Sequence, residues 1–178
     1  MPNWCENTLI VTGSDERVTE FDEKVIRIEN NGETSLALNN LYPCPNEEDA
    51  YNWRINNWGT KWECDVFSTK ESDGELTLHF LSAWAPPDLW VRYVAEHIFP
   101  DLYFHLTYLE TGAGFCGVLE GQGTLLYCEN GDILETDEKG EEVKYSSKDE
   151  RYKYVKTGEI IDNEDFIPEY RNPFSLIS

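Results

Sequence analysis

Basic residues are scarce in this chain. Its 178 residues include 14 Lys and Arg against 35 Asp and Glu, which gives a formal net charge of -21. Nucleic-acid affinity rests mainly on Lys and Arg that neutralise phosphates, so this deficit argues against direct binding of DNA or RNA. An excess of carboxylates also keeps an ordinary protein soluble, and this simple explanation stays open beside a sharper hypothesis. Under that hypothesis, an acidic face mimics DNA or attracts a basic partner protein.

Long apolar runs are missing as well, and the sequence predicts no N-terminal leader. The longest apolar stretches, such as residues 125–127, are far too short to span a membrane. The first four residues bring neither a basic region nor an apolar run, so no secretory signal is predicted. We therefore expect a cytoplasmic protein without a membrane partner.

The usual patterns of metal, disulfide and phosphate sites are also absent from the sequence. The five cysteines include no C-x-x-C pair, and their odd number leaves at least one unpaired. This scatter favours reduced, partly buried thiols. Two glycine clusters, at residues 112–114 and 121–123, do not continue into G-K-[ST] and are interpreted as turns. The sequence thus predicts neither a metal nor a cofactor.

Tryptophan, in contrast, is concentrated in one part of the chain. Four of the six tryptophans lie close together in the sequence, at Trp53, Trp58, Trp62 and Trp84. Side chains of this size dominate any core that they enter, so all four are predicted to be structural. They would hold a partly ordered aromatic insertion, at about residues 41–62, against the edge of a sheet.

Periodicity predicts an α+β domain over residues 1–120. Apolar alternation and short apolar runs predict strands over residues 4–12, 64–67, 75–81 and 102–110. Helical spacing predicts one helix with a buried stripe of Val18, Phe21, Val25 and Ile28, and a second that Pro86-Pro87 opens. The order strand, helix, strand, strand, helix, strand is that of the ferredoxin-like split βαβ fold (βαββαβ), an antiparallel sheet with two helices on one face.

The remainder, residues 121–178, is predicted to be an acidic, β-hairpin-rich appendage packed on this domain. Three similar units place a turn glycine before an acidic residue and apolar residues, at 129–134, 138–143 and 156–161. Asn130-Gly131 favours a hairpin turn in the first unit. The appendage has too few apolar residues to fold alone, so we expect a C-terminal β-meander that lies against the main sheet or a partner.

Several sequence blocks carry a resemblance to a known family. They are Met1 to Leu9, Trp53-Arg54 with Asn57 to Trp62, Trp84 to Pro87, Phe99 to Leu102 and Glu110 to Gly112. Together they resemble the YubB ferredoxin-like domain family of phages and conjugative plasmids, over about residues 1–120. The resemblance implies the fold that periodicity predicts and an origin in a mobile genetic element. It implies no catalytic residues, because that family has no agreed activity.

Candidate chemistry is confined to one weak patch. Glu6 on the first strand would share an open sheet face with His79 and His105, and such a group serves acid–base catalysis when it is desolvated. In the strand order 4-1-3-2, both histidines flank the first strand and lie about 9.6 Å apart, which is too far for one zinc ion. A structural or surface role for each histidine is the more ordinary interpretation.

Three classes of function remain open. The first is a non-enzymatic interaction protein that binds a host protein through its acidic surface and aromatic loop, in one form by occupying the basic groove of a nucleic-acid-binding defence system. The second is a small enzyme that uses the Glu6, His79 and His105 face. The third is a sheet-face nucleic-acid binder, which the charge opposes. Candidate partner-binding residues are Glu16, Glu20 and Glu23 on the first helix and Glu47, Glu48 and Asp49 on the loop.

Overall fold

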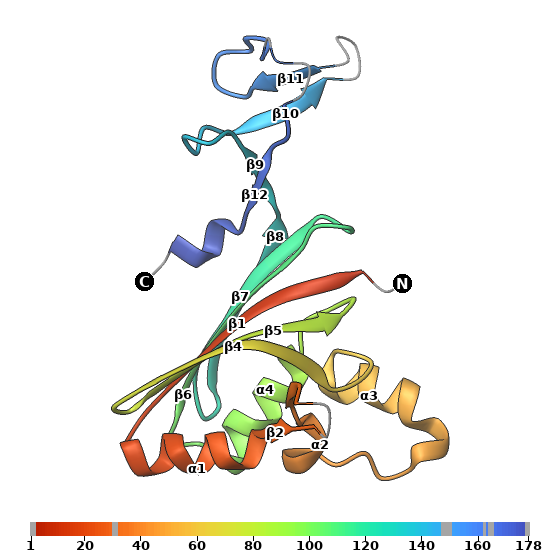
Figure 1. Cartoon of the computed structure of the whole chain (residues 1–178), viewed down its shortest axis with the longest axis vertical. Helices are drawn as coiled ribbons and strands as arrows, with labels where there is room; N and C mark the ends of the chain where they lie inside the picture. Colours follow the sequence, from red (N-terminus) through yellow and green to blue (C-terminus); the bar gives the residue numbers. More distant parts are fainter. Residues whose placement is uncertain (1–2, 30–31, 147–150, 162, 164–165, 177–178) are drawn as a thin grey trace.

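An eight-stranded antiparallel sheet organises the molecule. The computed structural model describes residues 3–29, 32–146, 151–161, 163 and 166–176 (Figure 1). Within these residues the sheet has the order β2-β3-β4-β5-β1-β6-β7-β8. The strands are β1 (Trp4–Thr12), β2 (Ile26–Ile28), β3 (Thr34–Leu36), β4 (Cys64–Ser72), β5 (Glu75–Ala83), β6 (Tyr103–Glu110), β7 (Phe115–Gln122) and β8 (Leu125–Asp132). The predicted α+β class is confirmed.

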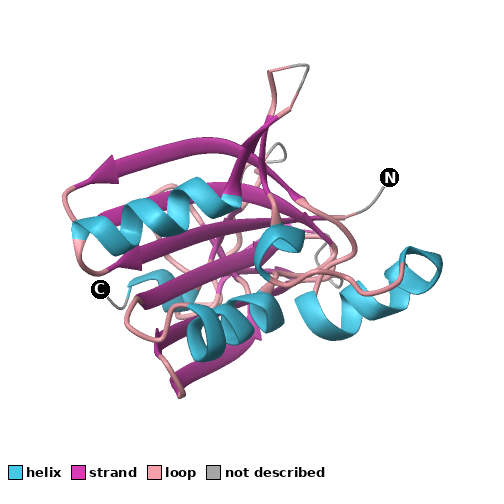
Figure 2. Cartoon of the chain, turned by 90° about the horizontal axis from the view of Figure 1, so that it is seen from below, coloured by secondary structure: helices cyan, strands magenta, loops and turns pink. Residues whose placement is uncertain are grey.

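The α-helices cover one face of this sheet, as Figures 1 and 2 show from two directions. They are α1 (Asp15–Val25), α2 (Leu38–Leu41), α3 (Ala50–Trp58), which follows the 3-10 turn η1 (Glu47–Asp49), and α4 (Asp88–Tyr93), which continues as the π-helical turn η2 (Val94–Ile98). The Phe21 ring of α1 meets the rings of Phe99 and Phe104 edge-on, with centroids 5.5 and 5.7 Å apart. No described helix is long and apolar enough to cross a membrane.

β1 lies at the centre of the sheet and shows how the alternating pattern divides its two faces. Leu9 and Val11 are fully buried beneath the helices, whereas Thr8 and Ile10 between them are only half-buried on the opposite, open face. Successive side chains of a strand point to opposite faces. β1, which a short apolar run predicted, alternates in this way, and the alternation predicted over residues 102–110 is confirmed in β6.

The first helix ends earlier than its apolar stripe predicts. Val18, Phe21 and Val25 are buried as expected, but α1 stops at Val25 and the following three residues form β2. There Ile26 and Ile28 pair with β3, and Ile28 is 74% exposed. Its inclusion in the buried helical stripe was therefore wrong. β-branched residues fit a strand well, and the available partner strand decided the outcome.

The aromatic insertion is more regular than a partly ordered loop. It follows α2 and contains η1 and α3. Gly59 caps the end of α3, and its φ of 89° lies in the left-handed region that favours glycine at a helix end. Trp58 is fully buried, and its indole Nε1 donates a hydrogen bond of 2.8 Å to the carbonyl oxygen of Tyr42. The two helical segments are thereby joined within the core.

The predicted turn at Asn130-Gly131 was wrong. Both residues lie inside β8, where they pair with Gly117 and Cys116 of β7. The chain turns earlier, between the ends of β7 and β8. Consequently β8 extends the main sheet, and the predicted domain boundary at residue 120 falls within β7.

The chain beyond β8 leaves the sheet and then returns to it. β9 (Leu134–Thr136) pairs with β12 (Glu169–Arg171), and β10 (Val143–Ser146) pairs with β11 (Arg151–Tyr154). Figure 1 shows these strands projecting away on the side opposite the helices, and the 3-10 turn η3 (Pro173–Leu176) lying back near the sheet. Asn172 Nδ2 donates to the carbonyl oxygens of Tyr108 and Gly117, each at 2.9 Å. We call β9–β12 the projection.

Candidate functional site

Lys61 lies at the centre of three exposed aromatic rings. Its Nζ lies 2.8 Å from the ring centroid of Trp84, and 5.6 and 5.7 Å from those of Tyr51 and Trp62. Lys61 is only 9% exposed, whereas Tyr51, Trp62 and Trp84 are 52%, 39% and 51% exposed. An ammonium group is attracted to the faces of aromatic rings. The buried cation therefore gathers these rings into one surface, which we call the aromatic cluster (Tyr51, Lys61, Trp62 and Trp84).

Two distant segments meet to build the aromatic cluster. The chain leaves α3 at Gly59, where an added Cβ would lie 2.6 Å from the carbonyl oxygen of Pro86. Next, Thr60 is buried and its hydroxyl donates a 3.1 Å hydrogen bond to the carbonyl oxygen of Ala83. These contacts fix Lys61 and Trp62 beside the turn that carries Trp84. The blocks Asn57 to Trp62 (NWGTKW) and Trp84 to Pro87 (WAPP) thus lie against each other.

Trp84 is held in an unfavourable backbone conformation. Its φ of 72° is the one positive value among the described residues other than glycine. A bulky residue in this region is strained, at a cost of about 1–3 kcal/mol. The backbone N–H of Trp84 donates a 2.9 Å hydrogen bond to the carbonyl oxygen of Asn3, which helps to fix this conformation. The fold therefore accepts strain while presenting a large ring that remains half exposed.

The four clustered tryptophans divide into two pairs. Trp58 is fully buried, and the Trp53 ring packs against the core with its centroid 6.0 Å from that of Trp58. Trp62 and Trp84 lie at the surface in the aromatic cluster. The structural role assigned to these two stays a prediction, and their exposure makes them available to a partner.

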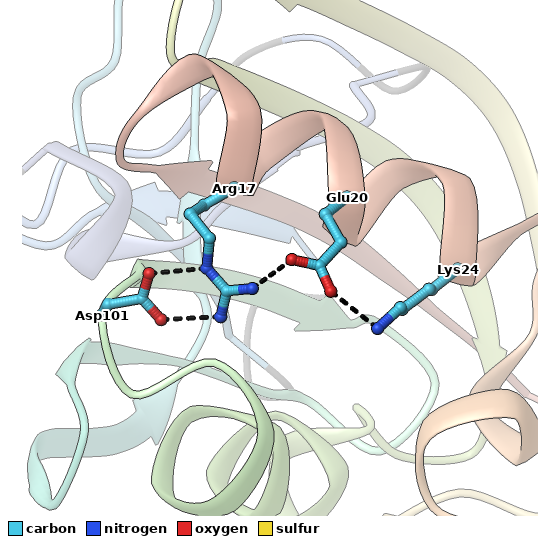
Figure 3. Close-up of polar contacts among 4 residues, drawn as sticks. All are labelled: Arg17, Glu20, Lys24 and Asp101. Atoms are coloured by element: carbon cyan, nitrogen blue, oxygen red, sulfur yellow. Dashed lines mark hydrogen bonds and ion pairs between the residues drawn. The ribbon is translucent and has the colours of Figure 1, made fainter.

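The six candidate acidic residues do not form one patch. Figures 1 and 2 place α1 and the η1–α3 segment at opposite ends of the helical layer. On α1, Glu20 contacts both Arg17 and Lys24, as Figure 3 shows. The hydrogen bond from Lys24 has the largest effect, and together with that from Arg17 it holds the pKa of the Glu20 carboxyl below the usual value. Glu16 and Glu23 are exposed and have no ion pair among the described residues.

The other three candidates belong to η1, directly before the helix that carries Tyr51. Glu48 and Asp49 are exposed, and neither has a cationic partner in the part of the chain that the structure describes. Asp49 Oδ1 accepts a 3.0 Å hydrogen bond from Asn52 Nδ2. The side chain of Glu47 lies outside the described residues. We call the Glu48 and Asp49 carboxylates the acidic turn, and they lie next to the aromatic cluster in the chain.

The predicted Glu6, His79 and His105 patch does not come together as one group. His79 and His105 lie on the two strands that flank β1, as predicted, opposite Thr8 and Ile10. Glu6 and His79 line the same hollow, of about 170 Å³, and His79 Nδ1 lies 3.0 Å from the Thr8 hydroxyl. His105 is outside that hollow.

His105 pairs instead with Glu120, a residue that sequence reasoning missed. Its Nδ1 lies 2.9 Å from Glu120 Oε2, which also accepts a 3.3 Å hydrogen bond from the Tyr103 hydroxyl. The register of β6 against β7 places Glu120 opposite His105. Knowledge of that register was the missing signal, since Glu120 follows a glycine-rich stretch whose pairing is hard to infer from pattern.

Neither the thiols nor the histidines form a metal centre in the described residues. No group of three or more His, Cys, Asp or Glu side chains there is placed to hold a metal ion. All five cysteines are free thiols. Cys5 and Cys64 are fully buried, and burial is the main factor that raises the pKa of Cys5 to about 12. A buried thiol that stays protonated is a poor nucleophile and a poor ligand.

Comparison with known proteins defines the family but not an activity. A family described as the ferredoxin-like domain in Api92-like protein matches residues 57–157, which is more than half of the chain, and the chain belongs to this family. The matched region begins in α3 and ends beyond β11, so it includes the NWGTKW and WAPP blocks. No curated protein and no solved structure matches the chain. The ferredoxin-like assignment is thereby confirmed at the level of the family.

Proposed function

We propose that this chain is a non-enzymatic interaction protein that binds a basic host protein through the aromatic cluster and the adjoining acidic turn. The observation that carries the proposal is the gathering of three exposed rings around Lys61, with Trp84 held there in a strained conformation. Trp and Tyr, together with Arg, are enriched among the few residues that carry most of the binding energy at protein interfaces. Exposed carboxylates beside them increase the association rate with a basic surface.

The distribution of charge supports a basic partner. Several of the few cations are engaged within the protein, as in the pairs of Arg17 with Asp101 and Arg27 with Glu29. Some carboxylates, in contrast, lie near one another. The pKa of Asp22 is raised mainly by burial, and then by the neighbouring carboxylates Glu71 and Glu23. The overall excess of carboxylates favours a basic partner over an acidic one.

Origin and topology extend the proposal. The order β6-β1-β5-β4 at the centre of the sheet supports a split βαβ core, with β2, β3, β7 and β8 as additions at the two edges. The resemblance to the YubB family supports an origin in a phage or conjugative plasmid. The partner that suits such a protein is a nucleic-acid-binding defence protein, whose basic groove the acidic surface would occupy.

The geometry supports the enzyme alternative less well. Small-molecule sites are usually clefts of about 300–1,000 Å³. The hollow that Glu6 and His79 share is smaller, at about 170 Å³, and His105 lies outside it. Glu6 and His79 therefore share a hollow that does not include His105, so the three candidate catalytic residues do not face one common site.

Capture experiments with paired variants test the proposal. The purified protein is immobilised, basic proteins from a bacterial host lysate are captured, and the affinity of the captured protein is then measured. The double variant Trp62→Ala and Trp84→Gly removes two exposed rings, and glycine tolerates the backbone conformation at 84. We expect it to weaken binding roughly thirtyfold or more, as the loss of a hot spot does.

Charge reversal separates the acidic turn from the general surface charge. Glu48→Lys with Asp49→Lys should slow association and flatten its salt dependence. The matched control, Glu16→Lys with Glu23→Lys, changes the net charge equally on α1 and should leave binding nearly unchanged. Equal effects from both reversals, or unaltered binding by the double tryptophan variant, would refute this interface. Circular dichroism confirms that each variant is folded.

A further inference from the structure

We infer that the hollow on the open face of the sheet receives an arginine side chain from a partner protein. The hollow lies on the face of β1, β5 and β6 that the helices leave uncovered, and its volume is about 170 Å³. Its lining includes Glu6, Thr8, Phe67, His79, Thr107 and Asn172. This site is separate from the aromatic cluster, and it rests on the proposed function only in assigning the arginine to the same basic partner.

One wall of the hollow suits a flat cation. The rings of Phe67 and His79 lie nearly parallel, at an angle of 27° with centroids 6.2 Å apart. Phe67 is 66% exposed, and the Thr8 hydroxyl holds His79 at 3.0 Å. A guanidinium group is planar and stacks on aromatic faces, whereas an ammonium group is a strongly hydrated point charge. The paired rings therefore favour arginine over lysine.

Glu6 supplies the negative charge. It is exposed and has no ion pair among the described residues. Its cross-strand neighbours are Leu81 on β5 and Leu109 on β6, so neither residue directly opposite it is a cation. A carboxylate beside apolar neighbours is a good acceptor for the two parallel N–H bonds of a guanidinium group. The Thr107 hydroxyl, opposite Thr8, provides a further acceptor in the hollow.

The C-terminal segment closes the far wall and gives the hollow a fixed shape. Asn172 is 8% exposed and bridges two neighbouring strands through the carbonyl oxygens of Tyr108 and Gly117. Its Oδ1 also accepts a 2.9 Å hydrogen bond from the backbone N–H of Phe174. A wall anchored in this way is preorganised, which lowers the cost of ordering the site when it binds.

The size of the hollow decides the class of ligand. It is smaller than the usual site for a metabolite or cofactor, which occupies about 300–1,000 Å³. One side chain that projects from a protein surface needs less space, because the rest of its chain stays outside. The charge, the flat ring pair and the volume together select a single guanidinium group.

Titration with short peptides tests this inference on the full chain. An acetylated, amidated Gly-Arg-Gly peptide is added to isotope-labelled protein, and the backbone amide resonances are followed by NMR. We expect saturable shifts at Thr8, His79 and Thr107, with a weak affinity typical of one side chain. Two matched peptides carry citrulline, which keeps the planar shape without the charge, or lysine, which keeps the charge without the plane.

The expected order of affinity is arginine first, with citrulline and lysine clearly weaker. Glu6→Gln should weaken the arginine peptide roughly threefold to tenfold, and Phe67→Ala should weaken it as well. Glu16→Gln, an equal change at an exposed carboxylate on α1, should have no effect. Equal binding of the citrulline or lysine peptide, or equal effects of the two glutamate variants, would overturn the inference. The captured partner can still depend on the aromatic cluster in that case, so the two proposals fail separately.

Discussion

The sheet body and the projection are stabilised in different ways. In the body, large side chains such as Trp58, Trp90 and Phe104 are fully removed from water between the sheet and the helices. Beyond β8, Val143 and Pro168 are the two buried apolar side chains among the described residues. Burial of apolar area is the main source of folding free energy, so the body carries most of the stability of the chain.

The projection relies on local polar and aromatic contacts instead. The Asp137 carboxylate accepts hydrogen bonds from the backbone N–H groups of Lys139 and Glu141, at 2.9 and 2.8 Å, and from the Tyr154 hydroxyl at 3.1 Å. The Tyr152 ring lies 5.4 Å from that of Tyr145 and 5.3 Å from that of Phe166. Such contacts order a segment without a large core, and they can open while the body stays folded.

The largest expected effect comes from truncating a large side chain in the core of the body. Trp58→Ala should lower the free energy of unfolding by about 3–5 kcal/mol, because it leaves a cavity and removes the donor to the Tyr42 carbonyl oxygen. Tyr152→Ala should leave the unfolding of the body nearly unchanged. Urea unfolding followed by far-UV circular dichroism measures both, and Trp58→Phe serves as the conservative control. Similar losses in both alanine variants would remove the distinction between the two regions.

Much of the body could be predicted because each long strand and helix buries one face, so its apolar residues recur at the spacing of a strand or of a helix. Leu9 and Val11 in β1, and Phe104 and Leu106 in β6, alternate with less buried residues as a sheet with one covered face requires. Ile28 and Asn130-Gly131 were misplaced for a shared reason. Their conformation depends on a partner strand, β3 in one case and β7 in the other, and local propensity does not contain that information.

The residues of the candidate site could be predicted from the sequence, but their contacts with one another could not. The tryptophan-rich blocks stand out in the sequence, but the contact of Lys61 with Trp84 depends on how the end of α3 meets the turn after β5. A tertiary contact of this kind has no periodic signal. The same holds for the open face, where the strand positions of Glu6 and His79 were foreseen but the return of Asn172 to the sheet was not.

A smaller effect is expected from acidifying the projection. Hydrogen bonds from backbone N–H groups hold the pKa of Asp137 below its usual value, and the bond from Glu141 has the largest effect. The unfolded carboxyl has a pKa of about 3.9, so the stabilisation is present above that pH and is lost as pH falls through the lower folded value. Amide exchange at Lys139 and Glu141 should therefore accelerate below about pH 4, relative to the amides of Leu9 and Val11.

A matched variant identifies the group responsible for that acid response. Asp137→Asn keeps an oxygen that can accept the backbone hydrogen bonds but cannot titrate in this range. In the variant, exchange at Lys139 and Glu141 relative to the amides of Leu9 and Val11 should stay constant across the acidic range, with no transition near pH 4. Persistence of the acid transition in Asp137→Asn would assign it to another group. Simultaneous exposure of Leu9 would show that the projection and the body open together.

The smallest expected effect concerns the ion pairs on the surface of the body. Arg17 binds Asp101 through two parallel contacts, at 2.7 and 2.8 Å, and Figure 3 shows it between Asp101 and Glu20. Both side chains of the Arg17–Asp101 pair remain partly exposed, at 30% and 50%. Water and salt screen such pairs, so a double-mutant cycle with Arg17→Met and Asp101→Asn should give a coupling of about 0.2–1 kcal/mol.

Salt dependence then separates the charge term from packing. The coupling should shrink between about 0.05 M and 1 M salt, because the Debye length falls to about 3 Å. The Arg17 guanidinium also lies 4.6 Å from the Phe99 ring centroid, and the Met side chain keeps part of that apolar contact. A coupling well above 1 kcal/mol that survives high salt would mean that α1 is held to the turn before β6 by electrostatics. In that case packing alone would no longer account for the stability of the body.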